Sequence, residues 1–137
     1  MGIKLQTLKV LDSKQLEGAV EVARKERASG LIVLPSPHTN SYRKQIVVLV
    51  ANSRPPAMYP LKEYVEEGGL IAYGPNVLEM YQRAATFVDK ILKGRTPSDL
   101  PVEQSTKFEL VINLKAAIQI SLTIPPNVPA RADQIIR

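Results

Sequence analysis

The chain has 137 residues, the length of a single domain, of which 45% are hydrophobic and 23% charged, so a disordered or fibrous protein is excluded. Eighteen basic residues against thirteen acidic ones give a formal charge of +5, with the two signs interspersed along the sequence. The absence of cysteine and the single histidine, His38, exclude disulfides, thiolate metal sites and paired-histidine metal sites.

The first half of the chain alternates predicted strands with predicted helices. Alternating polarity predicts a strand over residues 4–11, and apolar residues at helical spacing predict a helix over 13–27. The apolar run 31–34 is typical of a strand that is buried on both faces of a parallel sheet. Two prolines predict irregular structure over 35–40, and a helix is expected over 41–53.

The second half continues this alternation. We expect, in order, a strand at 57–59, a short helix at 61–67, a strand at 70–73, a long helix at 77–93, a strand at 108–112 and a short helix at 113–119. The tail from residue 125 is proline-rich and then weakly helical. Strands that alternate with helices predict an α/β fold with a parallel sheet, in which ligands bind beyond the carboxyl ends of the strands.

Three loops follow the carboxyl ends of the predicted strands and are expected to share one rim. They are residues 35–40, Tyr59 with Pro60, and residues 73–76. Their side chains can hydrogen-bond to a small molecule or stack on it, but the loops contain no carboxylate pair and no activated nucleophile. Binding is therefore favoured over catalysis. An enzyme would need an acid/base pair at the rim, and the nearby carboxylates for such a pair are Glu63 and Glu66 on the short helix after Tyr59.

Several of these loop residues also have an ordinary structural interpretation. His38 can be a histidine in a solvated turn, and Tyr59 and Tyr73 can be tyrosines whose rings lie in the core. In the same way, Gly74 can serve only to permit a turn, and Asn76 can serve only to cap a helix. The sequence contains no glycine-rich phosphate loop, so nucleotide binding has no support. Nucleic-acid binding is not expected either, because aromatic residues make up only 5% and no basic stripe is present.

A specific order of motifs begins at residue 68. It runs Gly68-Gly69-Leu70-Ile71-Ala72-Tyr73-Gly74-Pro75-Asn76, then Tyr81-Gln82-Arg83-Ala84-Ala85, Val88-Asp89-Lys90-Ile91-Leu92-Lys93-Gly94, Pro97-Ser98-Asp99-Leu100-Pro101-Val102 and Lys107-Phe108-Glu109-Leu110-Val111-Ile112-Asn113. This order resembles the carboxyl-terminal lobe of ABC-transporter substrate-binding proteins of the tryptophan/phenylalanine-binding type, within the type I periplasmic binding protein fold. Residues 31–35 and 56–60 resemble the same family.

The resemblance implies a flavodoxin-like, three-layer α/β lobe without catalytic activity, cofactor or metal. In this family two such lobes close on a solute at their hinge, and the complex delivers it to a membrane permease. Residue by residue, the resemblance implies ligand contacts at Ser36, Pro37, His38 and Thr39 in one cleft loop, Tyr59 and Pro60 in the next, and Tyr73, Gly74 and Asn76 in the hinge motif.

The chain also departs from the family, whose members are about twice as long and begin with an export signal. We therefore expect residues 1–137 to form one truncated lobe, with weak or absent solute affinity. Residues 74–107 resemble the hinge-crossing helix and strand that belong to the missing lobe. The family works in the periplasm or elsewhere outside the cytoplasm, whereas the polar start of this chain predicts a cytoplasmic location as given.

The long helix at 77–93 would then lack its native partner. Its apolar stripe consists of Tyr81, Ala84, Ala85, Val88, Ile91 and Leu92. An exposed stripe of this kind predicts a homodimer, which can form by exchange of the helix between two copies. A stand-alone, flavodoxin-like dimeric module without a ligand is the alternative interpretation.

Overall fold

Five strands form one sheet in the spatial order β1-β2-β3-β4-β5 in the computed structural model, which describes residues 2–137. The strands are β1 (Leu31–Ile32), β2 (Ala57–Tyr59), β3 (Ile71–Pro75), β4 (Phe108–Asn113) and β5 (Gln134–Ile136). All neighbouring strands are parallel except β3 and β4, which are antiparallel with Ala72 opposite Val111. The expected α/β sheet is confirmed, but it is mostly parallel and not entirely so.

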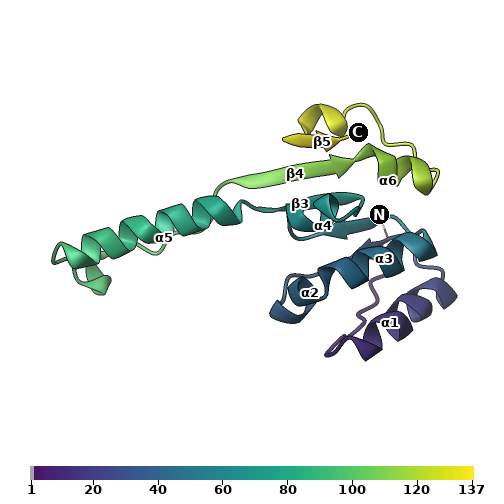
Figure 1. The fold of residues 1–137 in the computed structure, drawn as a ribbon, viewed down its shortest axis with the longest axis horizontal. Helices are drawn as coiled ribbons and strands as arrows, with labels where there is room; N and C mark the ends of the chain where they lie inside the picture. Colours follow the sequence, from purple (N-terminus) through teal and green to yellow (C-terminus); the bar gives the residue numbers. More distant parts are fainter. Residues whose placement is uncertain (1) are drawn as a thin grey trace.

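The antiparallel pair has a simple cause in the path of the chain. β3 leaves the sheet into a long excursion, and β4 re-enters beside the point where β3 left, with Pro75 opposite Phe108. A strand that re-enters at the same end must run in the opposite direction. The excursion contains helix α5 (Val77–Leu92) and the 3-10 helix η1 (Pro97–Asp99), and Figure 1 shows it projecting from the α/β body.

Four of the remaining helices were expected, at residues 13–27, 41–53, 61–67 and 113–119. The full set is α1 (Lys14–Lys25), α2 (Pro37–Ser41), α3 (Arg43–Ser53), α4 (Lys62–Glu66), α6 (Leu114–Gln119) and the 3-10 helix η2 (Pro129–Arg131). The prediction of irregular structure over residues 35–40 is wrong, because α2 begins there. Ser36 and Thr39 form a reciprocal cap, in which each side-chain oxygen accepts a 3.0 Å hydrogen bond from the other residue's backbone N–H.

One strand predicted near the amino-terminal end is absent, the burial expected for the next one is wrong, and a strand near the carboxyl end was missed. Residues 4–11 belong to no strand, since alternation alone supplies no hydrogen-bonding neighbour. The run at 31–34 is not buried on both faces: Ile32 is 66% exposed and Leu34 is 70% exposed, whereas Leu31 and Val33 pack against the core on the other face. The tail expected to be weakly helical contains the short 3-10 helix η2 and then forms β5, which pairs with β4.

Helices α1, α3 and α4 pack on the same face of the sheet. Their common core consists of Leu16, Ile46, Val47, Val50, Ala57, Tyr59, Tyr64, Val65, Ala72 and Val111. A second, smaller cluster joins Leu70 to Ala116 and Ala117 of α6. Because successive strand residues face opposite sides, Ile32 points away from the main core, and the second face of the sheet is covered only in part. The expected third layer is therefore incomplete.

Helix α5 has no buried residue along its whole length. A bidentate ion pair from the Arg83 guanidinium to the Glu103 carboxylate ties it to the returning segment, and this pair lowers the pKa of Glu103. The predicted stripe is largely open to solvent, with Tyr81 73% and Val88 55% exposed. No helix within residues 2–137 has the length and apolar character needed to cross a membrane.

Candidate functional site

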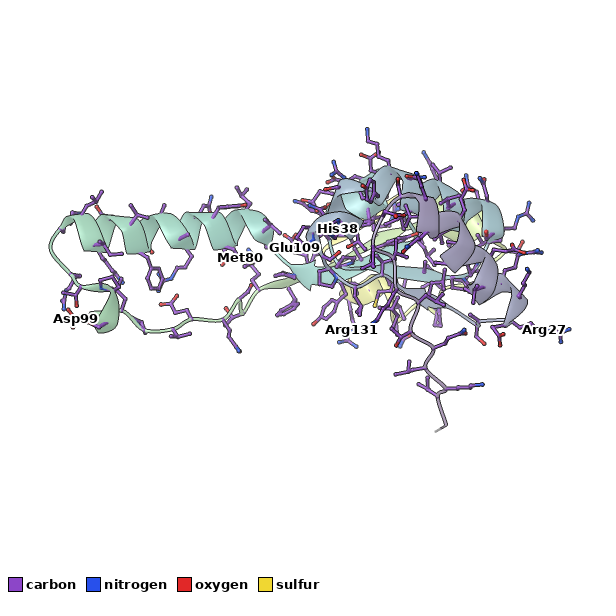
Figure 2. The ribbon with its side chains drawn as sticks, turned by 90° about the horizontal axis from the view of Figure 1, so that it is seen from below. Arg27, His38, Met80, Asp99, Glu109 and Arg131 are labelled. Carbon is purple, nitrogen blue, oxygen red and sulfur yellow. The ribbon has the colours of Figure 1, made fainter. Side chains whose placement is uncertain are left out.

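The three predicted loops lie toward one end of the α/β body. Figure 1 shows α2 and the beginning of α5 at the same end of the sheet, and Figure 2 places the labelled His38 and Glu109 there as well. The parallel arrangement of β2 and β3 accounts for this, because their carboxyl ends share an edge. The expectation of a common rim is consistent with this geometry.

The first loop presents fewer free polar groups than its sequence indicates. The hydroxyls of Ser36 and Thr39 are occupied in the cap of α2, and the Thr39 hydroxyl also donates to the Leu34 carbonyl oxygen at 3.0 Å. Pro37 and His38 are exposed on the first turn of α2. The exposed polar side chains of this loop are therefore those of His38 and Asn40, and the two hydroxyls are engaged in the cap.

The second loop places its tyrosine in the core. Tyr59 is 2% exposed, and its ring stacks on that of Tyr64 with centroids 5.2 Å apart. Burial raises the pKa of the Tyr59 hydroxyl well above its usual value. The Tyr59 side chain thus has the structural role that was left open for it, and Pro60 is the part of this loop nearer to solvent.

The third loop combines an aromatic surface with a helix cap. Tyr73 is 53% exposed and stacks on Phe108 of the neighbouring strand, with centroids 5.5 Å apart. Asn76 caps α5, since its side-chain oxygen accepts a 2.9 Å hydrogen bond from the Glu79 N–H. The amide nitrogen of Asn76 donates to a Glu109 carboxylate oxygen, which ties the start of α5 to β4.

A pocket of about 240 Å³ opens beside this third loop, between the beginning of α4 and the beginning of α5. It is lined by Lys62, Glu63, Pro75, Val77, Leu78, Tyr81 and Glu109. The two carboxylates and the lysine give it a polar side, and the other residues give it a largely apolar wall. Sequence reasoning did not place Lys62 or Glu109 here. The position of Glu109 depends on its pairing with Gly74 across an antiparallel ladder, which was not predicted.

Three side-chain atoms near this end of the body are buried without a hydrogen-bond partner within residues 2–137: Arg43 Nε, Glu63 Oε2 and the Tyr64 hydroxyl oxygen. Burial raises the pKa of Tyr64, while the nearby Thr39 hydroxyl and the Arg43 charge act in the opposite direction. No group of three or more acidic, histidine or cysteine side chains within residues 2–137 is placed to hold a metal ion. The arrangement offers hydrogen bonds, charge and an apolar wall, which suit the binding of a small molecule.

Comparison with known proteins points to one family. The family described as "ABC transporter substrate binding protein" matches residues 1–136 of the chain. No curated protein matches the sequence.

Three solved structures share the fold. A conserved domain protein from Vibrio cholerae O1 biovar El Tor is 29% identical, with a TM-score of 0.89, over 98% of this chain and 45% of its own. The ABC domain from Streptococcus pneumonia in complex with L-Trp is 25% identical, with the same TM-score and coverage. A ligand-free, open substrate-binding protein with adhesive properties from Clostridium difficile, 18% identical with a TM-score of 0.63, covers 93% of this chain and shares the fold. The chain thus spans less than half the length of each of these proteins.

Proposed function

Because the chain belongs to the ABC transporter substrate-binding protein family, whose members are binding proteins and not enzymes, we propose that it is a solute-binding lobe of an ABC importer. The solute is an aromatic amino acid or a similar small molecule. The observation that carries this proposal is the similarity, over 98% of the chain, to a domain in complex with L-Trp. The site acts outside the cytoplasm and delivers the solute to an ABC permease.

The proposed wall of the binding site consists of the three loops at the rim. Ser36, Pro37, His38, Thr39, Pro60, Tyr73, Gly74 and Asn76 face or frame the solute, and Tyr59 supports the second loop from within the core. The half-exposed Tyr73–Phe108 stack supports an aromatic solute in particular, because it offers an aromatic surface at the rim. The proposal needs no cofactor.

Residues 74–107 are proposed to belong to a second lobe, which they reach across the hinge. Helix α5 stands away from the α/β body, and none of its residues is buried, which supports this assignment. A site that closes between two lobes buries a solute from both sides, whereas one lobe offers a single wall. The affinity of this chain by itself is therefore expected to be weak or absent.

The open stripe on α5 also supports association of two copies, by apposition or by exchange of the helix. The alternative function is a stand-alone, flavodoxin-like dimeric module without a ligand. The same exposed stripe favours that alternative. It differs from the proposed solute-binding function because the rim residues would then bind no solute.

Thermal unfolding with and without solutes tests the proposed function. Because the affinity of a single lobe is expected to be weak at best, the solutes are used at millimolar concentration. L-tryptophan, L-phenylalanine or L-tyrosine should then stabilise a lobe that retains its site, and glucose at equal concentration should have no effect. A ligand present at ten times its dissociation constant raises the free energy of unfolding by about 1.4 kcal/mol. Stabilisation by none of the aromatic amino acids, with a dimer seen by light scattering, would favour the alternative.

A further inference from the structure

The outer edge of strand β1 is open. Leu31 and Val33 donate their backbone N–H groups to carbonyl oxygens in and just before β2, at 2.8 and 2.9 Å. Because successive residues of a strand point their backbone groups to opposite sides, the N–H groups of Ile32 and Leu34 face the other way. β1 is the first strand of the sheet, so no strand within residues 2–137 lies on that side. This edge can therefore accept a further strand.

Residues 4–11 are a second unpaired feature, since they alternate in polarity like a strand and belong to none. Figure 2 shows the beginning of this part of the chain extending away from the α/β body. Leu5 is 82% exposed and Leu11 is 67% exposed, whereas Val10 packs against the main core and Leu8 is half-buried. In an extended strand, Leu8 and Val10 therefore share the covered face of the sheet, and Leu5 and Leu11 share the other face.

The path of the chain specifies where such a strand would lie. β1, β2 and β3 are parallel neighbours in chain order, and the helices α3 and α4 that connect them pack on one face of the sheet. Helix α1 packs on this face as well. Parallel crossovers almost always have one right-handed sense. A parallel strand just before α1, where residues 4–11 stand in the sequence, must therefore lie beside β1 on its outer side.

Both faces of the sheet match such a strand at this position. On the covered face, β1 and Val10 pack against the same core. On the other face, Ile32 and Leu34 are largely exposed, and Leu5 and Leu11 would lie on that face too. Contact among these side chains removes apolar surface from water, which favours docking of the strand.

We propose that residues 4–11 dock beside β1 as a sixth strand, parallel to it and within the same chain. The same chain supplies this segment at a higher effective concentration than a second copy does, because the segment is tethered through α1. The docked strand fixes the end of β1 from which the first rim loop begins, where the Thr39 hydroxyl donates to the Leu34 carbonyl oxygen. This inference goes beyond the proposed function and does not depend on a solute.

Hydrogen exchange of single backbone amides, followed by NMR of the isotope-labelled chain, tests this proposal. We expect the amides of Ile32 and Leu34 to exchange at least tenfold more slowly than in an unstructured chain, and equally so over a tenfold range of protein concentration. The double variant Gln6→Pro/Lys9→Pro should lose this protection. Its two positions have opposite parity, so one of the two lost N–H groups faces β1 in any register.

Gly2→Pro/Ile3→Pro is the matched control, because it adds two prolines to the same exposed segment but before the proposed strand. Matching amide spectra of the α/β body establish that all three proteins are folded, as expected from the exposure of the four substituted positions. Fast exchange of the Ile32 and Leu34 amides in the original chain, or equal protection in both double variants, would overturn the proposal. Protection that rises with protein concentration would assign the strand to a second copy and overturn it as well. No solute enters these measurements, so the proposed function stands or falls separately.

Discussion

The backbone of Pro60 occupies the place where a side chain on Gly74 would begin. An ideal Cβ atom on Gly74 would lie 1.8 Å from the Pro60 carbonyl oxygen and 2.9 Å from its carbonyl carbon. The loop after β2 and the end of β3 therefore approach each other more closely than any other residue at position 74 permits. This contact joins the second candidate loop to the hinge motif, so Gly74 positions the rim whether or not it touches a solute.

Gly74→Ala should lower the free energy of unfolding by about 2 kcal/mol or more, because the backbone of one of the two segments must move. Gly18→Ala is the matched control. Gly18 lies on an exposed part of α1, where an added Cβ meets nothing within 4 Å, and alanine is favoured there by about 0.5–1 kcal/mol. Urea unfolding of both variants measures the two changes. Equal effects of the two substitutions would show that the close approach at Gly74 is relaxed at little cost.

Tyr64→Phe should leave the stability unchanged or raise it by about 1 kcal/mol. The Tyr64 side chain is fully buried, and its hydroxyl has no hydrogen-bond partner in the part of the chain that the structure describes. Replacement by phenylalanine keeps the ring stacked on Tyr59 and removes an unsatisfied polar group. Thermal or urea unfolding checks this. A loss of more than 1 kcal/mol would indicate that the hydroxyl has a partner in solution, such as a bound water.

Stability should fall at alkaline pH because of Tyr59. Burial raises the pKa of its hydroxyl in the folded state above the ordinary value of 10, so the folded state holds a proton that the unfolded state releases. The protonated Tyr59 hydroxyl makes its full contribution to the free energy of unfolding below pH 10. This contribution is lost as the pH rises further, at up to about 1.4 kcal/mol per pH unit. Tyr64, whose pKa burial also raises, acts in the same direction.

Unfolding free energies measured at pH 8 and at successive values above pH 10 test this, with Tyr59→Phe as the variant that removes one such group. The slope above pH 10 should be shallower in Tyr59→Phe than in the original chain. Tyr81→Phe serves as control, since Tyr81 is 73% exposed and its replacement should leave the slope unchanged. A slope that is the same in all three proteins would be inconsistent with a buried, protonated Tyr59.

Much of the fold is local in origin, and those parts were predictable from the sequence. The helix that became α5 shows an apolar stripe, a capping asparagine at its start and Gly94 beyond its end. The reciprocal cap of Ser36 and Thr39 is equally local, and its serine–threonine spacing was visible although it was not recognised.

The failures are those where a distant segment decides the outcome. Residues 4–11 have the alternation of a strand but no neighbour to pair with, while β5 pairs with β4 despite a weak local pattern. The exposure of Ile32 follows from the incomplete cover on its face of the sheet, which its own apolar run does not reveal. In the same way, Glu109 enters the pocket only through the antiparallel register of β3 and β4.

The exposed stripe of α5 gives the last prediction, which concerns the association of two copies. Val88 lies near the middle of the stripe and is 55% exposed, and Tyr81 and Leu92 on the same face are more exposed still. If this face is buried between two copies, a carboxylate at position 88 must be buried with it, which is costly without a partner. Val88→Glu should therefore weaken dimerisation at least tenfold, a difference of about 1.4 kcal/mol.

Light scattering coupled to size exclusion, over a range of protein concentrations, measures the effect. Gln82→Glu adds one negative charge off the stripe of the same helix, and it should leave the dimer intact. Because no residue of α5 is buried within one chain, the fold of the α/β body should be the same in both variants, so a difference between them reports on the interface. A chain that stays monomeric at every concentration, or a dimer equally stable in both variants, would mean that α5 does not mediate association.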